Sequence, residues 1–81
     1  MSSSPFDDRI KDVMSEILEV APASIDDGFA RDDALSWDSM NHLRLVSALE
    51  EVFGIKFTMK EVGEMGRFAA IRSMVAERLQ G

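Results

Sequence analysis

The sequence predicts an all-α fold, a small four-helix bundle with three main helices, one short third helix and a long ordered loop after the first helix. Apolar residues recur at steps of three and four in three segments, whereas the strict alternation of a β-strand is almost absent. A segment rich in Asp, Pro and Gly separates the first two periodic segments. With 81 residues the chain has room for one domain, so we expect a single domain over residues 1–81, with residues 1–4 as a flexible leader.

The first predicted helix begins with residues that fit a helix start. Ser4, Pro5 and Asp7 fall at the N-cap, N1 and N3 positions, which favour a side-chain acceptor, a fixed φ angle and a carboxylate. The apolar residues that follow share one stripe, which requires a partner surface. They are Phe6, Ile10, Val13, Met14, Ile17 and Leu18.

A long connection is predicted from Ala21 to Trp37. The helical period disappears there, and Pro22, Gly28 and several aspartates favour turns. Loops longer than about 12 to 15 residues are uncommon in compact domains unless they have a function. We therefore expect an ordered loop whose apolar residues anchor it to the bundle, namely Ile25, Phe29 and Leu35.

The second helix is predicted to run from its N-cap Asp38 to Phe53, with Gly54 ending it in the left-handed conformation. At about 100° per residue, its main apolar residues cluster within roughly 120° of arc and are expected to face the core. These residues are Leu45, Val46, Leu49, Val52 and Phe53.

Thr58 and Glu61 form a capping-box pattern that opens a short third helix, which Gly63 and Gly66 are expected to end or loosen. The last helix places its apolar residues on one side. They are Phe68, Ile71, Met74, Val75 and Leu79. From the main stripes we predict a shared core of Leu45, Leu49, Phe53, Ile71 and Val75.

The composition excludes several classes of function. The chain has 15 acidic and 9 basic side chains and a formal charge of -6, so its surface should repel nucleic acid and attract basic protein patches. It has no cysteine, which excludes disulfides, thiolate metal sites and a cysteine nucleophile. No segment has the pattern of a signal peptide or of a membrane span. We expect a cytoplasmic monomer without a nucleic-acid partner and without membrane insertion.

The second helix carries an additional apolar strip that core packing does not require. The strip lies opposite the core face and begins beside Ser39, and its apolar members are Met40 and Leu43. Two exposed apolar residues are common on any protein surface, but a strip that has a charged border and begins beside Ser39, where a modifying enzyme could reach it, favours partner docking. The predicted docking residues are Met40, Leu43, Arg44, Ser47, Glu50 and Glu51.

Asp38, Ser39 and His42 are the residue types of a catalytic triad, but their crowding into one turn makes the triad geometry implausible. We therefore predict no catalytic residue. His42 should lie on the core side, near the loop, with its nitrogens hydrogen-bonded locally. Trp37 should be a loop aromatic packed against the helix. The segment Asp26-Asp27-Gly28 lacks the ligand pattern of a calcium loop, so no metal site is predicted.

The segment from Phe29 to Phe57 resembles the acyl carrier protein family. The similarity is most specific at residues 35–40, which read LSWDSM, and continues in LRLV at 43–46 and ALEEVFGI at 48–55. In that family the serine that opens the second helix receives 4′-phosphopantetheine from coenzyme A, through a magnesium-dependent phosphopantetheinyl transferase. The resemblance implies that Ser39 is the attachment site and that Asp38 is the motif aspartate recognised by the transferase.

The resemblance also implies a carrier rather than an enzyme. Such a carrier holds acyl intermediates as thioesters on its arm and presents them to acyl-loading and acyl-processing enzymes of fatty-acid, polyketide or specialised lipid synthesis. The chain departs from the common fatty-acid pattern at Ser36, Trp37, Met40, Asn41 and Arg44, and Arg44 makes the docking face less acidic. We therefore expect a specialised member. Two alternatives stay open, an aminoacyl or peptidyl carrier and an unmodified helical interaction module.

Overall fold

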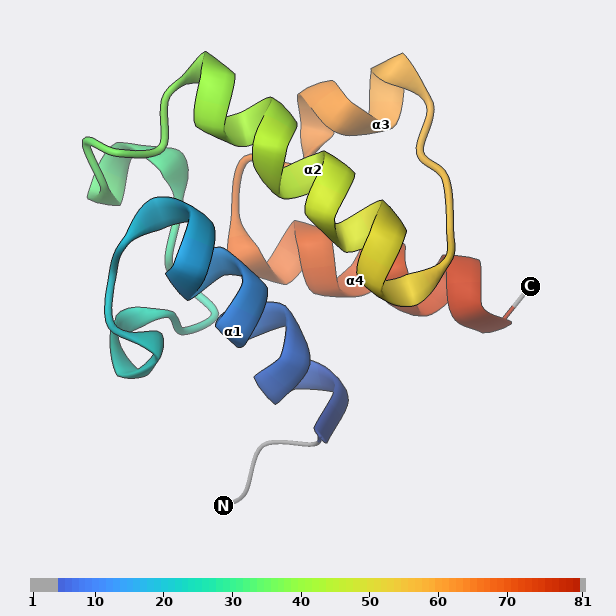
Figure 1. The fold of residues 1–81 in the computed structure, drawn as a ribbon, viewed down its shortest axis with the longest axis horizontal. Coiled ribbons are helices and arrows are strands. Elements are labelled where there is room, and N and C mark those ends of the chain that lie inside the picture. Colours follow the sequence, from blue (N-terminus) through green and yellow to red (C-terminus); the bar gives the residue numbers. More distant parts are fainter. Residues whose placement is uncertain (1–4, 81) are drawn as a thin grey trace.

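The computed structural model describes residues 5–80 and shows an all-α arrangement. The helices are α1 (Pro5–Leu18), α2 (Ser39–Phe53), α3 (Met59–Glu64) and α4 (Phe68–Gln80), and the single-turn 3₁₀ helices η1 (Pro22–Ser24) and η2 (Arg31–Asp33) lie in the loop between α1 and α2. In Figure 1, α1 and α2 lie side by side and run in opposite directions, while α4 passes behind α2. No strand occurs within residues 5–80. The predicted fold class, with a short third helix, is confirmed.

The core is built from the predicted apolar stripes. The predicted shared core is confirmed at Leu45, Leu49, Ile71 and Val75, all fully buried, whereas Phe53 is half-buried. The stripe of α1 contributes the fully buried Ile10, Met14 and Leu18, with its other members packed against them. Burial of these side chains is the main favourable term that holds the helices together.

Two residues predicted to face the core lie near its edge instead. Val52 is 37% exposed and Leu79 is 49% exposed. Both lie in the last turn of their helices, α2 and α4. Periodicity predicts which side of a helix a residue takes, but it does not show how far neighbouring helices extend along that side.

The loop after α1 is anchored by apolar side chains and by its backbone. Ile25 and Phe29 are buried as predicted, but Leu35 is fully exposed and that prediction is wrong. Leu35 lies in the turn after η2, where its neighbour Trp37 takes the buried position. The loop backbone also bonds to the start of α4, since the Phe68 amide donates to the Phe29 carbonyl at 2.9 Å.

The helix ends follow the predicted pattern only in part. The predicted cap Ser4 and the leader 1–4 lie outside the described residues. Gly54 ends α2 at φ 66°, and the capping box of α3 is present, so both predictions are confirmed. Gly63 does not end α3, because the helix continues through it to Glu64. Within residues 5–80, no helix combines the length and the apolar character needed to cross a bilayer.

Candidate functional site

The start of α2 brings an aspartate cap and an exposed serine together. Asp38 has an extended backbone, and its Oδ1 accepts a hydrogen bond from the Asn41 amide at 2.8 Å. This interaction is the N-cap that the sequence predicts, and it satisfies one of the amides that a helix start leaves without a partner. Ser39 is the first residue of α2 and its side chain is exposed.

The position of Ser39 fits a covalently attached phosphate. The first backbone amides of an α-helix point toward its N-terminus, and the helix dipole makes that end favourable for negative charge. A phosphodiester on the Ser39 oxygen would therefore lie close to these amides while the exposed side chain leaves space for a long substituent. The residues at the start of α2 fit such a group without a buried pocket.

The segment that precedes Ser39 is anchored on its inner side. The Ser36 hydroxyl donates to the Leu18 carbonyl at 2.6 Å, which ties the segment to the end of α1. The Asn41 side-chain amide donates to the Ser36 carbonyl at 2.8 Å, which ties the same segment to the first turn of α2. Ser36 and Asn41 are two of the departures from the common fatty-acid pattern. In this structure their side chains fix the segment that precedes Ser39.

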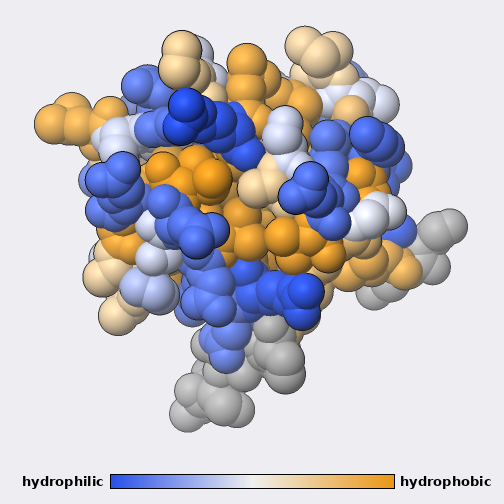
Figure 2. Space-filling model, viewed as in Figure 1, coloured by the Kyte–Doolittle hydropathy of each residue, from blue (hydrophilic) through white to orange (hydrophobic). Residues whose placement is uncertain are grey.

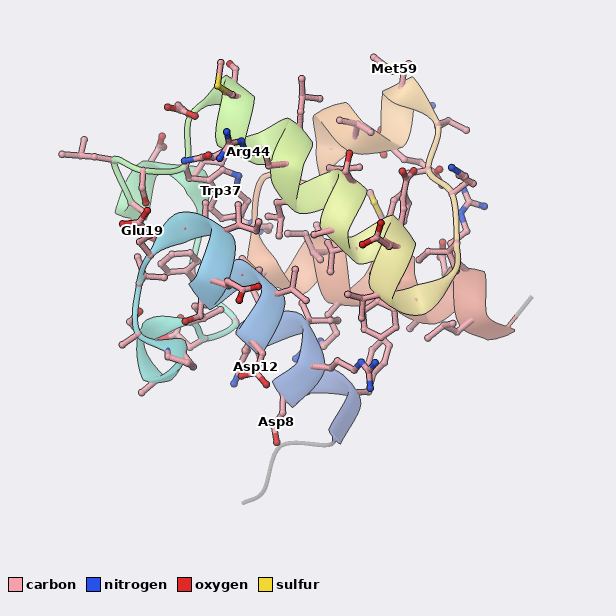
Figure 3. The ribbon with its side chains drawn as sticks, in the orientation of Figure 1. Asp8, Asp12, Glu19, Trp37, Arg44 and Met59 are labelled. Atoms are coloured by element: carbon pink, nitrogen blue, oxygen red, sulfur yellow. The ribbon has the colours of Figure 1, made fainter. Side chains whose placement is uncertain are left out.

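His42 is buried, and both of its ring nitrogens are engaged. The Trp37 indole N–H donates to His42 Nδ1 at 2.9 Å, and His42 Nε2 lies 2.7 Å from the Val62 carbonyl oxygen of α3. Figure 3 shows Trp37 beside the first turns of α2. The prediction of a tucked, hydrogen-bonded histidine is confirmed, and neither nitrogen is available to take a proton from Ser39. Sequence reasoning missed the partner Val62, since nothing local indicates a contact with a residue twenty positions away.

The outer side of α2 is open. Met40 is 67% exposed and Leu43 is 56% exposed. Arg44, Ser47 and Glu51 are also exposed. Figure 2 shows hydrophobic residues along the edge where Figure 1 places α2 and α3. The structure thus brings the predicted strip to the surface beside Ser39.

Two residues, Glu50 and Met59, differ from what the sequence predicts for the outer surface. Glu50 is half-buried, and its Oε2 accepts a hydrogen bond from the Phe57 amide at 2.9 Å, so this carboxylate also holds the connection between α2 and α3. Met59 on α3 is 82% exposed and points outward in Figure 3. Sequence reasoning did not assign Met59 to the surface, because the first residue of a short helix has too few periodic neighbours to show which side it takes.

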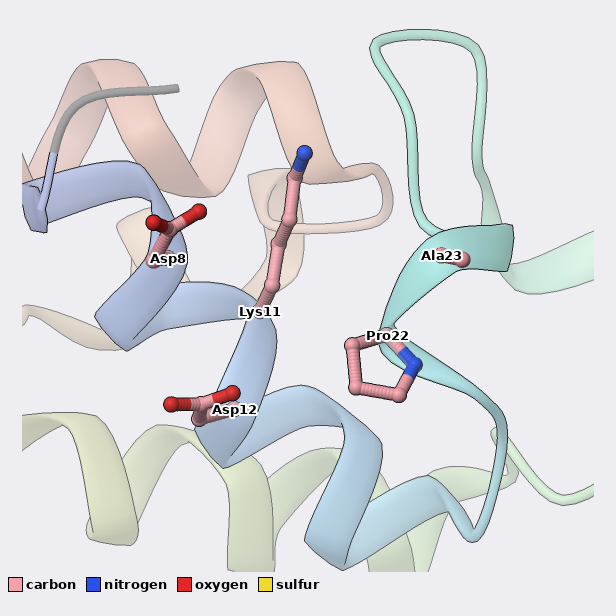
Figure 4. A pocket seen from close by; sticks show the side chains of 5 residues that line it. All are labelled: Asp8, Lys11, Asp12, Pro22 and Ala23. Carbon is pink, nitrogen blue, oxygen red and sulfur yellow. The ribbon is translucent and has the colours of Figure 1, made fainter. Parts of the chain in front are cut away.

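A surface hollow of about 410 Å³ lies elsewhere, between α1 and η1. Figure 4 shows Asp8, Lys11 and Asp12 of α1 facing Pro22 and Ala23 of η1. None of these residues belongs to the Ser39 region. In the part of the chain that the structure describes, no group of three or more histidine or carboxylate side chains could hold a metal ion.

Comparison with protein-family models matches residues 8–77 to the family described as phosphopantetheine attachment site, also called PP-binding. The match covers most of the chain, including the capped start of α2. The chain therefore belongs to this family and is a non-catalytic carrier domain for a 4′-phosphopantetheine group. This confirms the predicted kind of family, cofactor and non-enzymatic role. Comparison with curated proteins gives no match.

Proposed function

We propose that the protein is an acyl carrier protein with 4′-phosphopantetheine attached to the Ser39 oxygen. The observation that carries the proposal is an exposed serine hydroxyl on the first residue of α2, directly after the capping Asp38, inside the matched family region. When bound, the arm supplies a thiol that holds cargo as a thioester. The chain itself presents the attachment point and a docking surface for partner enzymes.

The other described serines support the choice of Ser39. Ser15, Ser24 and Ser36 each donate their hydroxyl hydrogen to a backbone carbonyl of the loop or a helix end. Ser47 and Ser73 are exposed but lie inside α2 and α4, away from the first-turn amides. Among residues 5–80, Ser39 alone combines an exposed hydroxyl with a helix N-terminus.

The test is modification by a phosphopantetheinyl transferase with coenzyme A and magnesium, read by intact mass. We expect the wild type to gain one phosphopantetheine and Ser39→Ala to gain none. Ser47→Ala is the matched control, because it removes an exposed hydroxyl from the same helix, and it should be modified like the wild type. A wild type that several broad-specificity transferases leave unmodified, or a modified Ser39→Ala, would contradict the assignment.

The acyl cargo rests on the resemblance of residues 29–57 to acyl carrier proteins. An aminoacyl or peptidyl carrier would use the same arm and the same serine, and would differ in its loading enzyme. The holo protein should therefore be offered both to acyl-loading enzymes and to amino-acid-activating enzymes. We expect an acyl thioester in the first reaction. Efficient loading by the second reaction alone would make the protein an aminoacyl carrier.

We also propose that partner enzymes dock on the predicted face of Met40, Leu43, Arg44, Ser47, Glu50 and Glu51. The exposure of Met40 and Leu43 supports this role, because the bundle does not use these side chains as core. Leu43→Ala should slow modification or loading without unfolding the protein. Leu79→Ala is the matched control, because Leu79 is a comparably exposed leucine on α4.

Charge on the same face should tune the choice of partner. Arg44→Glu should speed transfer by a generic fatty-acid transferase and weaken binding to dedicated partners, and both effects should shrink as salt rises. Glu51 is the better acidic position to test, because Glu50 also binds the Phe57 amide. If Leu43→Ala, Arg44→Glu and Glu51→Ala fold normally and leave every partner rate unchanged, recognition must lie in another surface.

A further inference from the structure

The Trp37–His42 hydrogen bond connects the segment before Ser39 to the interior of the bundle. Trp37 lies two residues before Ser39 and His42 three residues after it. Both side chains are buried, at 3% and 6% exposure, and their rings stack with centroids 6.1 Å apart. The buried side of the Ser39 turn is thus held by one indole and one imidazole.

The two partners of His42 determine where its proton lies. An indole N–H can only donate, so His42 Nδ1 must be an unprotonated acceptor toward Trp37. A carbonyl oxygen can only accept, so His42 Nε2 must carry the proton that faces Val62. The arrangement therefore requires a neutral imidazole with its hydrogen on Nε2.

Protonation affects the two contacts differently. A charged imidazole carries hydrogen on both nitrogens, so Nε2 continues to donate to the Val62 carbonyl. On the other side, the new Nδ1–H faces the Trp37 N–H, and two donors oppose each other at a distance that now holds a 2.9 Å hydrogen bond. Protonation breaks the contact with Trp37 and leaves the contact with α3 in place.

No described carboxylate compensates for the added charge. The elements around His42 are α2, α3 and the part of the loop from η2 to α2, and their charged side chains are Arg31, Asp32, Asp33, Asp38, Arg44, Glu50, Glu51, Lys60, Glu61 and Glu64. Asp38 caps α2 and Glu61 pairs with Arg78, and within residues 5–80 no acidic group forms an ion pair with His42. The indole is therefore the group that must move when the imidazole becomes charged.

We propose that His42 is a positioning residue for Ser39: as a neutral imidazole it fixes Trp37 and the segment before Ser39, and protonation releases them. The release is local. The hydrogen bonds of the Ser36 hydroxyl and of the Asn41 side chain do not involve the indole, so they limit how far the segment moves. Carriers of this sequence would thus present Ser39 in a fixed geometry while the His42 ring is neutral and in a looser one when the ring is charged. The effect on modification rests on the proposed attachment at Ser39, whereas the release itself does not.

The composition makes the test direct, because the chain has one tryptophan and one histidine. We would record nuclear magnetic resonance spectra at pH 5.5 and 7.5, following the Trp37 indole N–H, the His42 ring and the protection of the Trp37 and Asn41 amides. The two pH values lie on either side of the unperturbed pKa of a histidine side chain, and exposed aspartates stay mostly ionised at both. In the wild type, we expect the indole resonance to move as His42 becomes charged, and amide protection to fall roughly three- to tenfold, the factor of one lost hydrogen bond.

Two variants separate positioning from general stability. His42→Gln keeps one acceptor and one donor but has no charge to gain, so its indole resonance and amide protection should stay the same at both pH values. Trp37→Phe keeps the aromatic stack but lacks the N–H, so its Asn41 protection should already be lower at pH 7.5 and should change little in acid. If His42→Gln does not fold, the wild type is compared with Trp37→Phe alone.

The rate of phosphopantetheine transfer gives the functional readout. The rate of the wild type divided by that of His42→Gln cancels the transferase's own pH dependence, and this ratio should fall roughly three- to tenfold from pH 7.5 to 5.5. The proposal is overturned if His42 stays neutral down to pH 5.5, if the indole resonance does not move when His42 titrates, or if the ratio is constant. If Ser39 is not the attachment site, no variant is modified at that residue, and the spectra still decide whether Trp37 is released.

Discussion

Substitution of Asp38 separates the capping role of this residue from its predicted recognition by the transferase. In the structure its Oδ1 accepts the Asn41 amide at 2.8 Å, and its backbone is extended, as an N-cap requires. Asp38→Ala removes that acceptor and should lower the free energy of unfolding by about 1 kcal/mol, within a range of about 0.5–2 kcal/mol. For a domain of 81 residues, 1 kcal/mol corresponds to a fall in Tm of about 4–8 °C.

Asp38→Asn is the informative comparison, because asparagine caps a helix about as well as aspartate. It removes only the charge at the helix N-terminus, an effect of about 0.3–1 kcal/mol. If the transferase recognises the charge, Asp38→Asn should be nearly as stable as the wild type but slowly modified. Asp38→Ala should be both less stable and slowly modified. Thermal unfolding by circular dichroism and transfer rates by intact mass measure the two properties independently.

Two results would refute this reasoning. An Asp38→Ala protein with the wild-type Tm would show that the N-cap hydrogen bond contributes nothing to stability. An Asp38→Asn protein modified at the wild-type rate would show that the transferase does not read the charge. In that second case Asp38 would only cap α2, and the recognition role implied by the family resemblance would not apply to this chain.

Leu49→Ala should cost about 2–5 kcal/mol in urea unfolding, whereas Phe53→Ala should cost less than the about 3–5 kcal/mol of a fully buried phenylalanine, because Leu49 is fully buried and Phe53 only half-buried. A wild-type unfolding midpoint for either variant would contradict the core. The Thr58 amide and then Arg78 hold the pKa of Glu61 below its usual 4.5. This carboxylate therefore stabilises the fold above pH 4.5, and the contribution is lost as pH falls through the lower folded value. The Glu61→Gln variant should not lose this stability as pH falls. Identical acid unfolding curves for the variant and the wild type would contradict the proposed contribution of Glu61.

Local chemistry made much of the fold predictable. Asp38, Gly54 and Thr58 mark helix ends by interactions with atoms a few residues away, so their roles can be read without knowing the tertiary structure. The apolar stripes predicted which side of each helix enters the core for the same reason, because a helix repeats every 3.6 residues. The position of Ser39 at a helix start follows from the same local signals.

Features that depend on distant partners were not predictable. Leu35 was expected to anchor the loop, but it is exposed. Trp37 is buried instead, and its indole donates a hydrogen bond to His42. The end of α1 gave no sequence signal, since Glu19 adopts the left-handed conformation at φ 58° where glycine is usual. Glu50 was assigned to the outer face, and its bond to the Phe57 amide depends on the path of the connection to α3.

The first turn of α2 divides into an anchored side and an open side, and this division bears on how such a carrier diversifies. Asn41 and His42 face the loop and α3, and each makes hydrogen bonds whose loss would leave a polar group without its partner. Met40, Leu43 and Arg44 are exposed, and none of them carries a bond on which the fold depends. Substitutions on the anchored side alter the hydrogen bonds that hold the backbone around Ser39. Substitutions on the open side alter the charge and shape of the surface at little cost in stability. If partner enzymes dock on the open side, as proposed above, partner choice can change at Arg44 while the geometry at Ser39 stays the same.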